Sequence, residues 1–172
     1  MGLVSMNTTA RAETELLDNL VVEQQDEFQE VDLLEELVKY QPVPKIQTRL
    51  YSFFKKHKVK RPEFYASLLA RYPMSEAKKK MLAAMIVPES RGNTNAVSCK
   101  GAEGILQVMP SWKRRLGIKG SLKNPAVNLD AASRVYDIHL KDAKGNQDRA
   151  LLAYSGGSSW YPRKIRTLVS QI

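Results

Sequence analysis

Residues 88–110 read PESRGNTNAVSCKGAEGILQVMP, and this stretch decides how the chain is interpreted. One carboxylate, Glu89, stands near its start among mostly small and apolar neighbours. A carboxyl group held in a poorly solvated cleft has its charged form disfavoured, so its pKa rises and it keeps a proton near neutral pH. The stretch therefore predicts that Glu89 is a general acid.

A second cluster of aromatic and small residues, Ala153-Tyr154-Ser155-Gly156-Gly157, follows a predicted helix. Taken in order, the Glu89-Ser90 pair, the run from Gly101 to Pro110 and this cluster resemble the catalytic domain of the soluble lytic transglycosylase family. The resemblance covers residues 75–172. It implies a mainly α, lysozyme-like fold.

The resemblance also implies an enzyme, a lytic murein transglycosylase that cleaves the β-1,4 bond between N-acetylmuramic acid and N-acetylglucosamine in peptidoglycan. Glu89 would protonate the glycosidic oxygen, and the acetamido group of the substrate would help carry the positive charge. The muramyl 6-hydroxyl would then attack its own anomeric carbon. The expected product is a 1,6-anhydromuramyl end, formed without water, a metal or another cofactor.

Several side chains are implied to line the cleft. One of the tyrosines is expected to donate a hydrogen bond to the catalytic carboxylate, and Tyr154 is the leading candidate. Without the resemblance, a tyrosine is more often a half-buried core residue, a serine caps a loop and a methionine packs in the core. The full set of predicted substrate-binding residues is Ser98, Gln107, Met109, Tyr136, Ala153, Tyr154, Ser155 and Tyr161.

Three positions depart from the family pattern. Ser155 stands where the family usually has Asn, Ala132 where Gly is common, and Pro88 directly before the acid is unusual. Serine keeps a hydrogen-bonding group but has a shorter reach than the amide. The Ser155 change is therefore expected to affect substrate affinity more than chemistry.

Two other functions stay open from the sequence. A hydrolytic muramidase, resembling goose-type lysozymes, needs a second carboxylate about 5–5.5 Å from the first as nucleophile, or about 6.5–9.5 Å away to activate water. Glu103, Asp130 and Asp137 are the candidates. Alternatively, the changes at Ser155 and Pro88 leave a non-catalytic protein that binds peptidoglycan or assists assembly.

The charge is unevenly distributed along the chain. Residues 1–40 carry ten acidic and two basic side chains, a net charge of −8, whereas residues 41–172 carry 25 basic and eight acidic ones, a net charge of +17. A body this basic attracts polyanions, and the glycan strands of peptidoglycan with their peptide carboxylates are the predicted partner. Nucleic acid is a weaker candidate, because the basic residues are scattered without a basic-aromatic repeat.

Composition excludes several classes of protein. A chain of 172 residues suits one catalytic domain with a smaller appendage, and no apolar run is long enough for a membrane helix. Cys99 is the single cysteine, and His57 and His139 lie far apart, which disfavours a disulfide, a cysteine-rich metal site and a Ser-His-Asp triad. The chain begins without a recognisable secretory signal, yet peptidoglycan implies a periplasmic, extracellular or cell-wall location.

The pattern of apolar residues and helix breakers divides the chain into three parts. These are an acidic helical segment over 1–44, short helices that pack on the core over 45–74, and the lysozyme-like domain over 75–172. The sequence names no protein partner for the acidic segment. Helices are predicted at 13–40, 45–57, 62–72, 76–89, 105–109, from 125 onward, 147–155 and 162–171.

Overall fold

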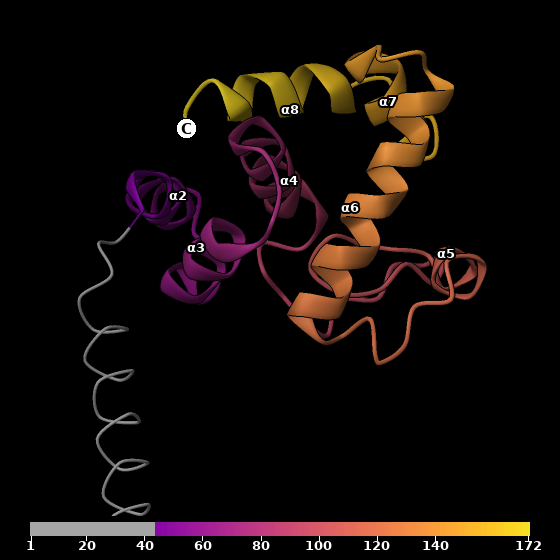
Figure 1. Ribbon diagram of the computed structural model, residues 1–172, viewed down its shortest axis with the longest axis horizontal. Helices are drawn as coiled ribbons and strands as arrows, with labels where there is room; N and C mark the ends of the chain where they lie inside the picture. The colour runs from indigo at the N-terminus through magenta and orange to yellow at the C-terminus, as the bar shows by residue number, and fades with distance from the viewer. Residues whose placement is uncertain (1–43) are drawn as a thin grey trace, which may run out of the picture. The chain divides into compact units, whose positions relative to one another are not determined.

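The computed structural model describes residues 44–172, and the helix predicted over 13–40 lies outside this range. The described part is mainly α, as predicted, and its only β pairings are isolated bridges (Figure 1). Within it no helix is both long and apolar enough to cross a membrane. The helices are α2 (Lys45–Lys56), α3 (Pro62–Arg71), α4 (Glu76–Glu89), α5 (Pro110–Arg115), α6 (Pro125–Asp142), α7 (Gln147–Tyr154) and α8 (Tyr161–Val169).

Helix α4 forms the centre of the core and contacts α2, α3, α6 and α8 (Figure 1). Every residue from Met81 to Val87 is buried, so this part of the helix is apolar around its whole circumference. Ser75 caps its first turn, as predicted, by accepting a hydrogen bond from the Lys78 amide at 3.3 Å. The helix ends at Glu89, one residue beyond Pro88, so a carboxylate stands at the end of a buried helix.

Helices α2 and α3 pack against each other and against α4 in the same core. Leu50, Phe54 and Tyr65 are fully buried there. The Tyr65 hydroxyl donates a hydrogen bond to the Gly92 carbonyl at 2.8 Å, which ties α3 to the chain that leaves α4. The two helices therefore support the chain segment that directly follows Glu89.

The prediction of a short helix over 105–109 is wrong. Glu103 and Val108 exchange two backbone hydrogen bonds of 3.0 Å, and the chain between them makes a tight turn. Gly104 and Gln107 have φ of +79° and +48°, in the left-handed region that an α-helix cannot use. We call residues 96–108 the hairpin loop; the next helix begins only at Pro110.

The predicted helix that follows Asn124 is α6, and its expected inward positions are confirmed. Asn124 accepts hydrogen bonds from the amides of Ala126 and Val127, and Leu129, Ala132 and Tyr136 are buried. Leu140 packs against the core with part of its surface exposed.

Helix α7 ends at a glycine pair, as predicted. The Gly157 amide bonds to the Leu152 carbonyl at 2.8 Å, the Gly156 amide bonds to the Ala153 carbonyl at 3.1 Å, and Gly156 has φ of +67°. This is the Schellman arrangement that closes a helix and reverses the chain. The reversal leads directly into α8, whose first residue is Tyr161.

Candidate active site

Glu89, at the end of α4, lies in an environment that favours the protonated form of its carboxyl group. Burial raises the pKa of Glu89 from its ordinary value of 4.5 to about 7, although a hydrogen bond from Tyr161 lowers it. The Tyr161 hydroxyl donates to Glu89 Oε1 at 2.5 Å. A carboxyl group in this state can give a proton near neutral pH and take one back afterwards.

The hydrogen-bond partner predicted for Glu89 was the wrong tyrosine. Tyr154 instead donates from its hydroxyl to the Leu106 carbonyl at 2.8 Å, because the end of α7 faces the hairpin loop. The chain reversal after α7 brings Tyr161 onto the carboxylate. Burial and the negative charge of Glu89 raise the pKa of both tyrosines well above the ordinary value, so both remain hydrogen-bond donors.

Tyr136 does not belong to this cluster. It is 3% exposed on α6, and its hydroxyl has no hydrogen-bond partner among the described residues. Burial is the main cause that raises its pKa, with a smaller contribution from Asp137 rather than from Glu89. Tyr136 packs in the core, and its role in substrate binding stays a prediction.

Ser98 and Gln107 both hold the hairpin loop in shape. The Ser98 hydroxyl accepts a hydrogen bond from the Ala102 amide at 2.9 Å. The Gln107 side-chain amide donates to the carbonyls of Gly104 and Ala96 at 2.9 and 3.2 Å. These hydrogen bonds stabilise the loop and do not test a contact with a sugar. The expected sugar contacts of Ser98 and Gln107 therefore remain predictions.

The remaining predicted binding residues lie at the surface next to these segments. Met109 directly follows the hairpin loop and is exposed, and Ala153 is exposed on α7. The Ser155 hydroxyl donates to the Leu152 carbonyl at 3.0 Å and accepts from the Ser158 amide at 3.2 Å. Serine at this position therefore stabilises the turn that leads to Tyr161.

Ser90 links the end of α4 to the hairpin loop. Its hydroxyl donates to the Ile105 carbonyl at 2.8 Å and accepts from the Gly92 amide at 3.0 Å. The Glu89-Ser90 pair belonged to the sequence motif, but no role for the serine followed from it. In the structure, the serine holds the chain directly after Glu89 against the hairpin loop.

Asn128 is a site residue that sequence reasoning missed. It is fully buried on α6; its Oδ1 accepts from the Leu106 amide at 2.8 Å, and its Nδ2 donates to the carbonyls of Glu103 and Leu122 at 2.8 and 2.9 Å. A Cβ atom on Gly104 would lie 2.2 Å from the Leu122 carbonyl, so only glycine fits beside this amide. The signal in the sequence was a polar residue next to an inward-facing leucine.

Two of the three other carboxylates proposed for a hydrolase have partners of their own. Asp130 accepts a hydrogen bond from the Tyr72 hydroxyl at 2.6 Å and pairs with Arg134 at 3.6 Å. Asp137 pairs with Lys78 at 2.6 Å and is exposed. Glu103 is partly exposed on the hairpin loop.

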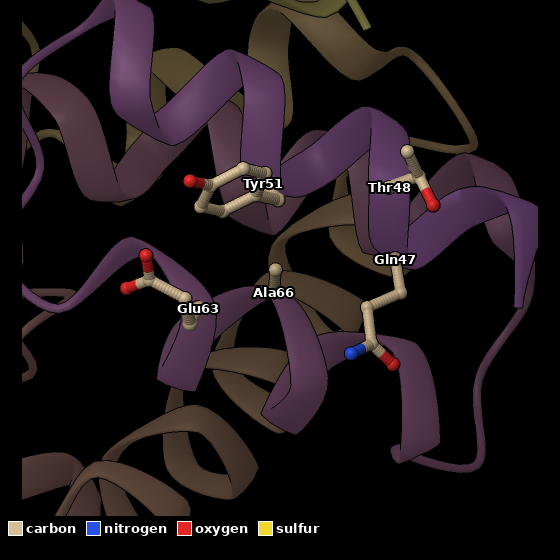
Figure 2. Close-up of a pocket in the computed structure, with 5 residues that line it drawn as sticks. All are labelled: Gln47, Thr48, Tyr51, Glu63 and Ala66. Atoms are coloured by element: carbon tan, nitrogen blue, oxygen red, sulfur yellow. The ribbon is translucent and has the colours of Figure 1, made fainter. Parts of the chain in front are cut away.

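A separate hollow lies between α2 and α3. Figure 2 shows Gln47, Thr48 and Tyr51 on α2 opposite Glu63 and Ala66 on α3, around a space of about 200 Å³. The carboxylate in this hollow, Glu63, is exposed, whereas Glu89 is shielded from water. The hollow contains none of the residues that surround Glu89.

The described residues form a mainly α domain with a partly buried acid at the end of its central helix, and this arrangement fits the lysozyme-like fold class. The chain matches the transglycosylase SLT domain over residues 70–168, and it belongs to this family. It is also similar to a transglycosylase of Enterobacteria phage PRD1, with 32% identity over 95 residues, or 50% of this chain and 35% of the phage protein. The match thus spans about a third of that relative's length.

Proposed function

We propose that this protein is a lytic transglycosylase that cleaves the β-1,4 bond between N-acetylmuramic acid and N-acetylglucosamine without water and leaves a 1,6-anhydro end. Membership of the family supports action on peptidoglycan. The observation that carries the proposal is a partly buried acid, Glu89, with a pKa of about 7 and a tyrosine on one oxygen. Such a group can serve in turn as acid and as base.

In the first step, protonated Glu89 donates to the glycosidic oxygen. The bond between that oxygen and the muramyl anomeric carbon breaks, and the departing N-acetylglucosamine takes the proton as its 4-hydroxyl. Positive charge develops on the muramyl ring. Glu89 is then a carboxylate, whose negative charge stabilises that ring, and Tyr161 stabilises the carboxylate through its hydrogen bond.

In the second step, the Glu89 carboxylate takes a proton from the muramyl 6-hydroxyl. The oxygen forms a bond with the anomeric carbon of the same sugar, which closes the anhydro ring. Glu89 is protonated again, and no atom from water enters the product. The site returns to its starting state.

The environment of Glu89 favours this route over a retaining hydrolase. A nucleophilic carboxylate about 5 Å away would repel the charged form of Glu89 and raise its pKa further. The pKa of Glu89 is instead set by burial and by Tyr161. Asp130 and Asp137 are engaged with Tyr72 and Lys78, which leaves Glu103 as the hydrolytic candidate to test.

The basic surface fits the proposed substrate and location. The described residues carry the whole net charge of +17 in residues 41–172, since residues 41–43 are uncharged, and peptide stems and wall polymers are anionic. We place the protein's action at the cell wall, in the periplasm or outside the cell. The glycan strand is the proposed partner.

The product mass tests the proposal directly. Purified sacculi digested with the full chain should release muropeptides one water lighter than the reducing-end products of a hydrolase. Glu103→Gln should change the rate less than about twofold, since neither proposed step uses this residue. Reducing ends together with a severe loss in Glu103→Gln would identify a muramidase, and binding to sacculi without release would identify a non-catalytic protein.

Tyr161→Phe should move the pH dependence of the reaction. The tyrosine lowers the pKa of Glu89, so its removal leaves the acid protonated to higher pH, and the alkaline limb of kcat/KM should shift upward. The maximal rate should fall about tenfold, because the charged form of Glu89 loses a hydrogen bond. Profiles of the variant and the wild type over the range around pH 7 provide the measurement.

Tyr72→Phe is the matched control for this experiment. It removes another bond between a tyrosine and a carboxylate, the one to Asp130, without touching Glu89. Its alkaline limb should coincide with that of the wild type. A limb that moves to lower pH in Tyr161→Phe would contradict the assigned role of Tyr161.

A further inference from the structure

Trp160 is a large exposed aromatic residue beside the catalytic cluster. It is 57% exposed at the start of α8, directly before Tyr161. The centroids of the Trp160 and Tyr161 rings are 5.5 Å apart and the ring planes are inclined by 65°. The Tyr161 hydroxyl donates to Glu89, so a single tyrosine ring separates Trp160 from the acid.

The start of α8 gives no structural reason for a tryptophan. Trp160 is the N-cap residue of α8 and makes no side-chain cap bond, so its side chain does not stabilise the start of the helix in that way. An indole ring that is largely exposed to water does not gain the favourable free energy that burial of its large apolar surface would give. Residues that break a local rule in this way are concentrated at functional sites.

Other exposed apolar side chains lie on the segments around Glu89. Val97 lies on the hairpin loop, Met109 directly after it, and Leu152 on α7 two residues before Tyr154. Among the described residues, Phe64 on α3 is the one exposed large hydrophobic side chain on a segment without a site residue. Val97, Met109 and Leu152 are thus each exposed on or directly beside a segment that also carries a predicted site residue, and exposed apolar surface there favours contact with a ligand.

Resting on the proposed function, we propose that the Trp160 ring is a stacking platform for one sugar ring of the glycan strand, next to the bond held at Glu89. A pyranose ring presents a face of C–H groups, and the face of an indole is apolar and electron-rich. The two faces attract each other while the sugar hydroxyl groups stay in water. Trp160 would thereby position the strand along the site and select a carbohydrate.

Trp160→Ala should raise KM for soluble, peptide-free glycan strands about 3- to 10-fold, the range expected for one aromatic contact. The value of kcat and the alkaline limb of the pH profile should not change, because the ring touches the substrate and not Glu89. Trp160→Phe should restore most of the affinity. Phe64→Ala is the matched control, since it removes an exposed aromatic ring from α3, and its KM should equal that of the wild type.

Fluorescence provides a second measurement that does not depend on turnover. The chain has two tryptophans, so Trp112→Phe leaves Trp160 as the reporter, and Glu89→Gln prevents cleavage. Titration of this double variant with glycan strands should change the emission to a plateau. Circular dichroism verifies that each variant is folded.

The possible outcomes separate this inference from the proposed function. An unchanged KM in Trp160→Ala, or glycan binding without an emission change, would overturn the platform even if the wild type forms the anhydro product. A lower kcat with a shifted pH limb would also overturn it, since Trp160 would then act by positioning Tyr161. If the wild type forms no anhydro product while Trp160 still responds to glycan, the proposed function fails and the platform stands.

Discussion

Glu89→Gln should reduce turnover by at least the roughly 10²- to 10⁴-fold typical of losing a general acid or base, while the fold persists. The amide has the size of the carboxyl group, and its oxygen can still accept the hydrogen bond from Tyr161. It has no acidic proton to give and cannot act as a base. Release of anhydro-muropeptides from purified sacculi, followed by mass spectrometry, is the measurement.

The same substitution should increase stability at alkaline pH. The pKa of Glu89 is about 7 in the folded protein against an ordinary value of 4.5. Near pH 4 the residue is mostly protonated in both the folded and the unfolded state, so it has little effect on the free energy of unfolding. As pH rises from 4.5 to 7 the unfolded chain releases its proton first, so stability falls, and above pH 7 the penalty is full, on the order of 3 kcal/mol at about 1.4 kcal/mol per pKa unit.

Glu89→Gln does not carry this penalty. Its midpoint of denaturation should equal that of the wild type near pH 4 and exceed it at pH 8. The combination of lost turnover and gained stability is specific to a buried acid kept for chemistry. A folded Glu89→Gln protein that still releases anhydro-muropeptides at a near wild-type rate would falsify the mechanism.

The acid was predictable from sequence because the neighbours in the chain are also its neighbours in space. The apolar run that precedes Glu89 becomes the buried α4, and this burial produces the raised pKa. The tyrosine was not predictable, since Tyr154 and Tyr161 both occur in the same motif region. The choice between them depends on the chain reversal at Gly156 and Gly157, which sets the direction of α8.

The conformation of the hairpin loop was not predictable, because it depends on residues that are distant in the sequence. Ile105, Leu106 and Val108 are apolar at a spacing that suits a short helix, and all three are indeed buried. The backbone nevertheless turns, because the left-handed conformations of Gly104 and Gln107 and the distant amide of Asn128 stabilise another geometry. Contacts over more than twenty residues along the chain cannot be inferred from local periodicity.

Asn128→Ala should be the most destabilising of the changes considered, with a loss of about 3–5 kcal/mol in the free energy of unfolding. The substitution leaves the Leu106 amide and the Leu122 carbonyl without their partner and removes one of the two bonds that the Glu103 carbonyl accepts. Each buried polar group left unpaired costs about 1–3 kcal/mol. Urea denaturation at neutral pH provides the measurement.

Asn146→Ala is the matched control, because it makes the same chemical change at an exposed position. Asn146 accepts one hydrogen bond from the Arg149 amide at the start of α7, and losing such a cap costs about 1 kcal/mol. If the two variants lose equal stability, Asn128 does not hold the loop. If Asn128 does hold it, the Leu106 amide should also exchange its hydrogen faster in the variant. The Leu106 carbonyl, which accepts the hydrogen bond from Tyr154, would then also be less firmly placed, so we expect the variant to lose activity through an amide on α6 that lies outside the Glu89–Tyr161 pair.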